Sequence, residues 1–364
     1  MNFVNFEIIL YSTLCALVLG PINSALARRV GLVDIPGREP HKKGNRRVPL
    51  AGGPILVETL LIVGLATGAA VVSDAWRILA ASGIVFVFGV WDDFRPLPPL
   101  VKLAGQVLAS VVLLVLGISV TLFSSPVLNV AVTILWMVTL TNAFNFVDSM
   151  DGLAAGLAAL ASAFFMLVSS STSQPRLAEF GALLLGSCVG CLYLNSHPAR
   201  FFLGDSGAQL LGFILAGLAI AYNPPGFSPY VSWFVPILLL AVPIFDMALV
   251  VYARLSARRP VYQGGLDHTY HRLVALGMSS ERAVLTMQMG GGLLGCLAFV
   301  ALALPDAWAN ATFFVVVALG VVLMLWLVRR TNSETEEVPE KQAMAKEVMA
   351  GKGERPKEED ERVV

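Results

Sequence analysis

The segment 141–153, TNAFNFVDSMDGL, places two amides and two carboxylates at three-residue spacing between two long apolar segments. Polar side chains are costly near hydrocarbon and usually bind a cation or a ligand there. Asn142, Asn145 and Asp148 share one helical face if the helix continues, because residues i and i+3 are neighbours. Asp151 then belongs to the following turn. Mg²⁺ prefers oxygen ligands and is usually held by few protein groups together with substrate phosphates, so an amide and a carboxylate from different segments would suit it.

An aspartate pair, Asp92 and Asp93, follows another apolar run directly. Carboxylates at a helix C-terminus face the unfavourable end of its dipole, and adjacent carboxylates repel. The pair therefore predicts a cation or a phosphate-proton partner, although a solvated helix end would show the same residues. Lys102, at the head of the next apolar segment, either supplies a positive charge for a phosphate or is an ordinary snorkelling lysine.

Two further polar clusters also begin or end apolar segments. Asp205 lies between glycines in FFLGDSG, where it is either a helix N-cap or, as we favour, a metal ligand. His268, His271 and Arg272 lie together in a later loop, and their spacing fits donors for a phosphate or a sugar better than a closed zinc site.

The basic segment 34–53, with regular Pro and Gly breaks, includes Asp34 and His41. It either signals orientation in the membrane or contacts an anionic nucleotide or phospholipid head. Two carboxylates inside apolar segments, Glu58 and Asp246, either line a cavity or pair internally.

The composition predicts an all-α polytopic membrane protein, because 56% of the residues are hydrophobic and only 14% are charged. A soluble domain carries about 25% charged residues. A transmembrane domain, 1–328, precedes a charged tail, 329–364, that we expect to be disordered and cytoplasmic. We expect the first apolar segment to be a retained helix rather than a signal peptide. The eleven predicted spans are approximately 4–27, 50–72, 76–91, 100–117, 126–144, 152–170, 177–195, 208–222, 231–253, 283–304 and 309–328.

The connections between these spans differ strongly in charge. One side receives nearly all the Lys and Arg of the loops, and the other receives only Arg77 and Arg176. Short loops rich in Lys and Arg stay in the cytoplasm, so the N-terminus is predicted outside and the C-terminus inside. All the polar clusters then fall on the cytoplasmic face. A transporter would place such groups near the midplane, commonly within repeated halves, so the distribution favours chemistry at the membrane surface.

The ordered set of an Asp pair, N-x-x-N-x-x-D-x-x-D-G-L and F-L-G-D-S-G resembles the polyprenyl-phosphate N-acetylhexosamine-1-phosphate transferase family. The resemblance runs from about Asp34 to Leu273. The family includes initiating enzymes of O-antigen, enterobacterial common antigen and teichoic acid linkage-unit synthesis, and the phospho-MurNAc-pentapeptide transferase of peptidoglycan synthesis. Many bacterial members carry H-x-H-H-R in the last loop, where this chain has Tyr270 at the middle histidine. The run of consecutive histidines of the peptidoglycan enzyme is absent, which favours the GlcNAc-1-phosphate branch.

The resemblance implies roles for single residues. Asn145 and Asp205 would hold Mg²⁺, with Mn²⁺ as an alternative ion. Asp92 or Asp93 would engage the lipid phosphate and Lys102 a phosphate. The remaining implied residues are His268, His271 and Arg272 at the pyrophosphate and sugar, and Asp148 and Asp151 near the nucleotide. Apart from the resemblance, Asp34, His41 and Asn142 are candidates for substrate binding, with a structural role as the alternative for Asn142.

The implied reaction is transfer of N-acetylhexosamine-1-phosphate from a UDP-sugar to undecaprenyl phosphate, releasing UMP and initiating a cell-envelope glycan. One-step transfer and a route through an aspartyl intermediate both remain compatible with the residues. The implied setting is the inner (plasma) membrane, with a lipid bilayer and no nucleic acid as partner, and a homodimer is compatible with it. The alternatives are the pentapeptide transferase, a transporter of lipid-linked or anionic solutes, and a non-catalytic membrane scaffold.

Overall fold

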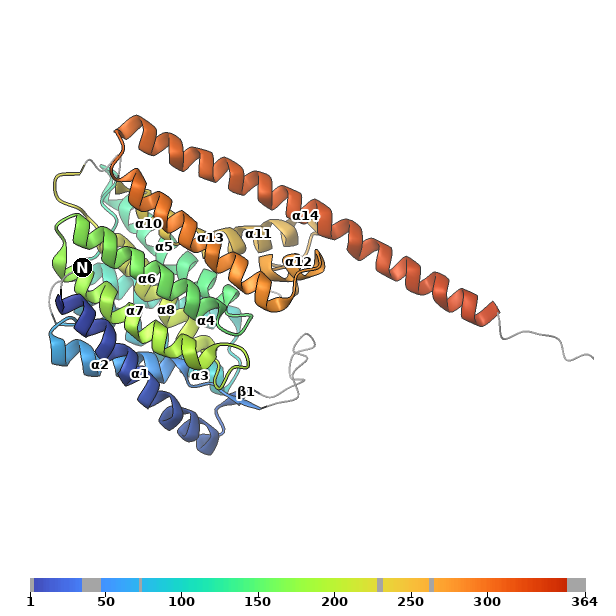
Figure 1. Ribbon diagram of the computed structural model, residues 1–364, viewed down its shortest axis with the longest axis horizontal. Helices are drawn as coiled ribbons and strands as arrows, with labels where there is room; N and C mark the ends of the chain where they lie inside the picture. Colours follow the sequence, from blue (N-terminus) through green and yellow to red (C-terminus); the bar gives the residue numbers. More distant parts are fainter. Residues whose placement is uncertain (1–2, 35–46, 72–73, 228–231, 262–264, 352–364) are drawn as a thin grey trace, which may run out of the picture.

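The computed structural model describes residues 3–34, 47–71, 74–227, 232–261 and 265–351, with side chains as far as Thr331. Within these residues the chain forms a bundle of helices that run alongside one another, with a two-stranded hairpin and the short helix α12 at one end (Figure 1). The described helices are α1 (Phe3–Val30), α2 (Gly52–Thr67), α3 (Ala75–Phe94), α4 (Pro99–Val115), α5 (Pro126–Val147), α6 (Leu153–Ser171), α7 (Pro175–Asn195), α8 (Gly204–Ala221), α10 (Val235–Leu239), α11 (Ala241–Ser256), α12 (Thr269–Ala275), α13 (Ser280–Ala301) and α14 (Asp306–Gly351). The strands are β1 (Val33–Asp34) and β2 (Val48–Pro49), which pair antiparallel.

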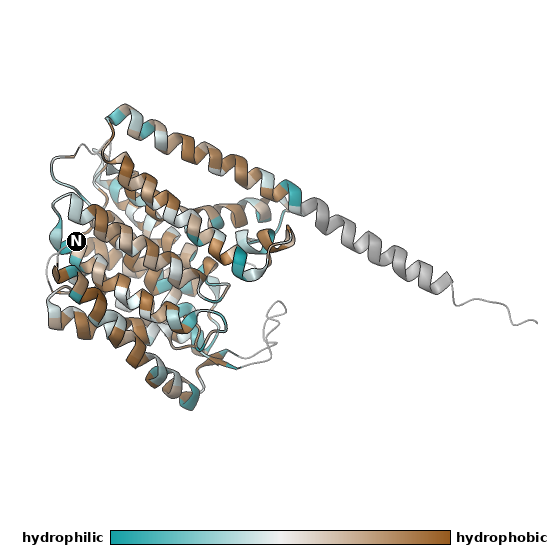
Figure 2. Cartoon of the chain, viewed as in Figure 1, coloured by the Kyte–Doolittle hydropathy of each residue, from teal (hydrophilic) through white to brown (hydrophobic). Residues whose placement is uncertain are grey.

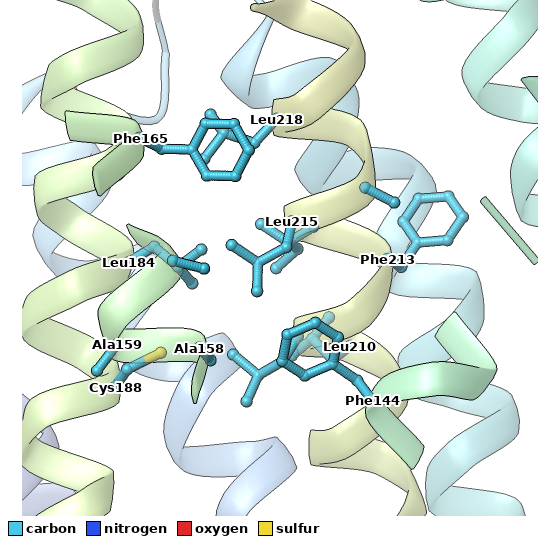
Figure 3. Close-up of a cluster of buried hydrophobic side chains, with 14 of the residues drawn as sticks. Phe144, Ala158, Ala159, Phe165, Leu184, Cys188, Leu210, Phe213, Leu215 and Leu218 are labelled. Atoms are coloured by element: carbon cyan, nitrogen blue, oxygen red, sulfur yellow. The ribbon is translucent and has the colours of Figure 1, made fainter. Parts of the chain in front are cut away.

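The centre of the bundle is made by α6, α7 and α8. In the most apolar 18-residue stretch of each helix, 78% of the residues of α8 are buried but only 17% of those of α14. Leu215 of α8, Phe165 of α6 and Leu184 of α7 meet in the core between these helices (Figure 3). Hydrophobic residues predominate along α14 as far as residue 328 (Figure 2), and α1, α13 and α14 carry many exposed large apolar side chains. Exposed apolar surface on this scale requires lipid around the bundle.

Eight described helices are long and apolar enough to cross a membrane, and α2 and α4 are shorter apolar helices of 16 and 17 residues. This confirms a mostly helical, multi-pass membrane protein, while the count of eleven spans remains a prediction. The predicted ninth span, 231–253, is not one continuous helix: α10 and α11 are separated at Leu240. Pro243 has no N–H to bond to the carbonyl of Leu239 four residues earlier, which explains the break.

Several helix ends extend further than the predicted spans. Helix α3 continues to Phe94, α5 continues to Val147, and α8 begins at Gly204. Asp92, Asp93, Asn145 and Asp205 therefore lie in terminal helical turns, where the helix fixes the direction of each side chain.

The predicted boundary at residue 329 is not a helix end. Helix α14 continues through the first part of the charged tail to Gly351. This part of the tail is rich in Glu, Lys, Ala and Met, all of which are good helix formers.

Candidate active site

The termini of α3, α4 and α8 meet at the end of the bundle where β1 and β2 lie. Lys102 Nζ, in the first turn of α4, lies 2.6 Å from Asp92 Oδ2 and 2.6 Å from Asp205 Oδ2. The lysine therefore joins the carboxylates of two helices and offsets their repulsion. Because the side chains of Lys102 and Asp205 are 28% and 27% exposed, this ionic cluster is open to solvent and to a ligand.

The second aspartate of the pair has a different task. Asp93 Oδ1 accepts a hydrogen bond from the backbone N–H of Asp205 at 2.7 Å, and Oδ2 accepts from the N–H and hydroxyl of Ser206 at 3.2 and 2.6 Å. These N–H groups belong to the first turn of α8 and have no partner within that helix. Asp93 thus caps α8 from another helix, and it fixes the backbone position of Asp205 in the first turn of α8. Of the two aspartates, Asp92 is the one that faces Lys102.

The approach of α3 to α8 depends on glycines. Gly204 has φ +71°, and a Cβ there would lie 2.7 Å from Asp93 Oδ2. A Cβ on Gly89 would lie 2.5 Å from the Cα of Ser206. Larger residues at these positions would push the two helices apart.

We therefore expect Gly204→Ala to destabilise the protein by about 1–3 kcal/mol, since an alanine in left-handed backbone is strained and its methyl group also displaces Asp93. The midpoint of thermal unfolding in detergent is the measurement. Gly68→Ala is the matched control, because Gly68 has φ +78° at the end of α2 but a Cβ on it would meet nothing within 4 Å. An equal loss in both variants would show that strain at residue 204 acts alone, without Asp93.

The end of the basic segment packs against the same loop. The backbone N–H groups of Ala51 and Gly52 donate to the carbonyl of Phe202 at 3.2 Å, and Leu50 forms a parallel bridge with Phe202. A Cβ on Gly53 would lie 2.3 Å from the hydroxyl of Ser206. The glycine pair therefore permits close backbone packing beneath Asp205. Asp34 lies in β1 opposite Val48, and His41 lies outside the described residues.

A layer of amide side chains lies one turn deeper in the bundle. Gln209 Nε2 donates to Asp205 Oδ2 at 3.1 Å, and Gln106 Nε2 donates to Gln209 Oε1 at 3.1 Å. Asn142 and Gln106 exchange two hydrogen bonds, of 2.7 and 3.3 Å. Asn142, a candidate for substrate binding from the sequence, is thus engaged in hydrogen bonds below the ionic cluster. This amide layer joins α4, α5 and α8.

Helical spacing relates the amide layer to the ionic cluster. Lys102 and Asp205 each lie four residues before a glutamine of the layer, toward the site end of α4 and α8. On α5 the site end is the C-terminus, so Asn145 lies one turn above Asn142. Asn145 is therefore on the level of Lys102 and Asp205, as the sequence predicts for a shared site.

The two other carboxylates of the α5–α6 connection differ. Asp148 is the C-cap residue that follows α5. Asp151 Oδ2 lies 3.0 Å from His197 Nδ1 and accepts the N–H of Ala199 at 3.1 Å. Asp151 therefore holds the loop after α7 in place, and any contact with a substrate would be additional to this role.

The histidine loop adds a second polar cluster beside the end of α5. Asp246 is fully buried in α11, and its Oδ2 lies 2.9 Å from Nδ1 of His268. Its Oδ1 accepts a hydrogen bond from the N–H of Thr269 at 2.6 Å. The ring of His268 packs edge-on against Phe146 of α5, with centroids 5.8 Å apart. Asp246 thus pairs internally, and it orients His268 so that Nε2 points away from the pair.

Tyr270 and His271 pack with their rings 3.9 Å apart, and the tyrosine hydroxyl lies 2.6 Å from His271 Nε2. Burial raises the pKa of Tyr270 to about 12, so the hydroxyl stays protonated at neutral pH and can donate to that nitrogen. The tyrosine therefore orients its neighbouring histidine.

Arg272 has hydrogen-bond partners in its own loop and in α14. It is buried, donates from Nε to the carbonyl of Asp267 at 3.1 Å, and donates from Nη1 to Thr331 of α14. In this arrangement the guanidinium joins α12 to α14, and its expected contact with a pyrophosphate or sugar stays a prediction. Sequence spacing alone could not show this, since the contact links residues far apart in the chain.

Asp267 fixes the same loop by ion pairs, with Oδ2 3.2 Å from Arg254 Nε and Oδ1 2.7 Å from Arg259 Nη2. Burial alone would raise the pKa of Asp267, but the hydrogen bonds and charges of the two arginines hold that pKa below its ordinary value. The loop that presents His268 is therefore a built element of the site.

The oxygen donors at this end fit Mg²⁺ bound with few protein ligands. Within the described ranges, no group of three or more His, Cys, Asp and Glu side chains could hold a metal ion. A carboxylate at Asp205 and an amide at Asn145 remain suitable when phosphates complete the coordination. The donor set therefore matches a cation site whose remaining coordination positions a phosphate substrate would fill.

Sequence reasoning missed Gln106, Gln209 and Ser206. The signal was available for the glutamines, since each lies four residues beyond a proposed site residue within an apolar helix. Ser206 carried no such signal, because its contact depends on Asp93 of a distant helix.

Comparison with known proteins gives a family for this chain. Residues 75–223, which span α3 to α8, match the family described as Glycosyl transferase family 4. A probable undecaprenyl-phosphate N-acetylglucosaminyl 1-phosphate transferase of Bacillus subtilis is 28% identical over 86% of this chain and 88% of its own length. A decaprenyl-phosphate N-acetylglucosaminephosphotransferase of Mycobacterium tuberculosis is 29% identical over 70% of each chain.

A phospho-N-acetylmuramoyl-pentapeptide-transferase of Moorella thermoacetica is 30% identical over 70% of this chain and 86% of its own length. The family match lies over the helices that carry the ionic cluster and the amide layer. On these grounds the chain belongs to glycosyl transferase family 4.

Proposed function

We propose that this membrane transferase moves GlcNAc-1-phosphate from UDP-GlcNAc to undecaprenyl phosphate, releasing UMP. The observation that carries the proposal is the ionic cluster of Asp92, Lys102 and Asp205 at the end of the bundle where the His268 loop also lies. The relatives from Bacillus subtilis and Mycobacterium tuberculosis, named for transfer to polyprenyl phosphates, support it.

The physical setting of the reaction supports a site at the membrane surface. A polyprenyl tail stays in hydrocarbon, whereas a nucleotide sugar stays in water, so the two phosphates can meet only at the boundary. The charge of the loops favours the cytoplasmic boundary, with the N-terminus outside and the C-terminus inside. Inner-membrane placement follows from the same reasoning.

The chemistry requires a lipid phosphate oxygen to attack the phosphorus that carries the sugar. A new P–O bond forms to the lipid phosphate, and the bond from that phosphorus to the oxygen bridging it to UMP breaks. Asp92 would orient the lipid phosphate or accept its remaining proton. Lys102 would bring a positive charge to a phosphate, and His268, held by Asp246 through Nδ1, would present Nε2 to the donor substrate. Asn145 and Asp205 would hold Mg²⁺, which when bound neutralises phosphate charge.

The proposal is tested by supplying the purified protein with UDP-GlcNAc, undecaprenyl phosphate and Mg²⁺ and measuring UMP. UDP-MurNAc-pentapeptide in a parallel reaction tests the second candidate function, which the Moorella thermoacetica relative favours. UMP release from UDP-GlcNAc alone supports the proposal. UMP release from UDP-MurNAc-pentapeptide alone would show instead that the protein is a pentapeptide transferase.

We expect Asp246→Asn to raise the KM for the UDP-sugar about tenfold with a smaller change in kcat, as loss of an orienting partner typically costs 10–100-fold. The amide does not stabilise the Nδ1–H form of His268 as the carboxylate does. Steady-state kinetics checks this result. A fall in kcat with an unchanged KM would instead show that Asp246 acts on the chemical step.

A further inference from the structure

We propose that Gln209, Gln106 and Asn142 form a directional hydrogen-bond relay that holds Asp205 oriented for a divalent cation. They are positioning residues, since none is proposed to touch a substrate. The proposal rests on the proposed function only in assigning Asp205 to the cation.

The direction of the relay is set at the α5 backbone. Asn142 Nδ2 donates to the carbonyl of Val138 at 2.8 Å and to Gln106 Oε1 at 2.7 Å. An amide oxygen cannot replace Nδ2 at the Val138 carbonyl, because both groups would be acceptors. Asn142 is therefore fixed in one of its two amide orientations.

This orientation passes to Gln106 and then to Gln209. Gln106 receives a hydrogen bond at Oε1, so its Nε2 faces Asn142 Oδ1 and Gln209 Oε1, at 3.3 and 3.1 Å. Gln209 accepts at its oxygen, and its Nε2 consequently faces Asp205. Reversal of any amide would place two acceptors together, so the three orientations are coupled.

The relay ends on one oxygen of Asp205. Gln209 and Lys102 both contact Oδ2, at 3.1 and 2.6 Å, and neither contacts Oδ1. The carboxylate is thereby held in a fixed rotation at the first turn of α8. Because the relay begins on α5, it also fixes the helix of Asn145 relative to that of Asp205. Both proposed cation ligands depend on the same three amides.

Burial makes the relay costly to disturb. Gln106 and Gln209 are each 2% exposed, so water cannot readily replace a lost partner. An unsatisfied amide in this layer would turn toward another partner, and the rotation of Asp205 would no longer be determined.

The test is Mn²⁺ binding to the full chain in detergent micelles, followed by electron paramagnetic resonance without substrate. We expect Gln209→Met to weaken Mn²⁺ binding at least tenfold, within the 10–100-fold typical of groups that orient a ligand. We expect Asn142→Leu, which does not contact Asp205, to weaken it by a similar factor. Gln174→Met is the matched control, because Gln174 is hydrogen-bonded to Thr172 and Asn223 outside the relay.

The double variant Asn142→Leu/Gln209→Met distinguishes a relay from two residues that affect Mn²⁺ binding independently. A relay predicts that the double variant binds Mn²⁺ about as well as either single variant, since either substitution already breaks the chain of orientations. Multiplicative losses, or wild-type binding in Asn142→Leu, would overturn the relay. Absence of Mn²⁺ binding to the wild-type protein would also overturn it.

UMP release by the same preparations keeps the two proposals apart. Turnover by the wild-type protein together with unchanged Mn²⁺ binding in Gln209→Met would reject the relay and leave the proposed function standing. Coupled losses of Mn²⁺ binding with no turnover by the wild-type protein would reject the proposed function and leave the relay standing.

Discussion

Asp205→Asn is expected to reduce UMP release about 10³-fold, because removing the charge that pairs with Lys102 and that we propose to hold a cation costs several kcal/mol of transition-state stabilisation. Asp205 is the residue on which α3, α4 and α8 converge, since it contacts Lys102 and Gln209 through its side chain and Asp93 through its N–H. Asparagine has the same shape and keeps the backbone contact. The start of α8 should therefore be preserved while the charge is lost.

The measurement is UMP release at saturating UDP-GlcNAc and Mg²⁺, with thermal unfolding as a check of folding. Asp74→Asn is the matched control, because Asp74 precedes α3, at the opposite end of that helix from Asp92, and its exposed ion pair with Arg77 should matter little. More than one tenth of wild-type activity in Asp205→Asn would contradict the role given to this carboxylate.

Asp92→Asn and Asp93→Asn are expected to fail in different ways, although the residues are adjacent. Asp93→Asn should lower the free energy of unfolding by about 2–4 kcal/mol, since it weakens a helix cap and leaves buried donors without an acceptor. The side-chain nitrogen of the new asparagine would face the N–H and hydroxyl of Ser206, which now donate hydrogen bonds to Asp93. Asp92→Asn keeps an acceptor for the N–H of Leu97 but loses the charge beside Lys102.

We therefore expect Asp92→Asn to lose activity about 10²-fold, within the range given to a positioned acid or base, with little change in stability. Thermal unfolding and UMP release measured on both variants check the pair. Wild-type stability in Asp93→Asn would show that capping of α8 is not its main role. Greater loss of stability in Asp92→Asn than in Asp93→Asn would reverse the assignment.

The convergence of the polar clusters could be predicted from the sequence. Each cluster lies at the end of an apolar segment, and alternate ends of spans fall on one side of a membrane. The structure confirms by direct contact that Asp92, Lys102 and Asp205 meet. The three-residue spacing also placed Asn145 on one helical face with Asn142, and its role as a cation ligand stays a prediction.

The division of work within the Asp pair could not be predicted from residue types. Successive residues on a helix point about 100° apart, so Asp92 and Asp93 must face different neighbours. Which neighbours these are depends on how α3 packs against α8, and that packing rests on Gly89 and Gly204. The same reason applies to Arg272, whose partner Thr331 lies on α14.

The first loop contains a motif with two interpretations. The segment 34–53 was predicted either to signal orientation or to contact an anionic group, and the structure uses its Gly52 and Gly53 for packing against Leu203 and Ser206. Glycine permits close approach of any group, and only the fold shows whether that group is a ligand or a backbone.

The central claim, that the sugar moves together with its phosphate, is tested most directly with doubly labelled UDP-GlcNAc. The donor carries ³H in the sugar and ³²P in the phosphate next to the sugar, and the reaction with undecaprenyl phosphate is extracted into organic solvent. We predict that both labels enter the lipid product in equal amounts and that unlabelled UMP stays in water. Transfer of ³H without ³²P, with labelled UDP released, would show simple glycosyl transfer and contradict the account.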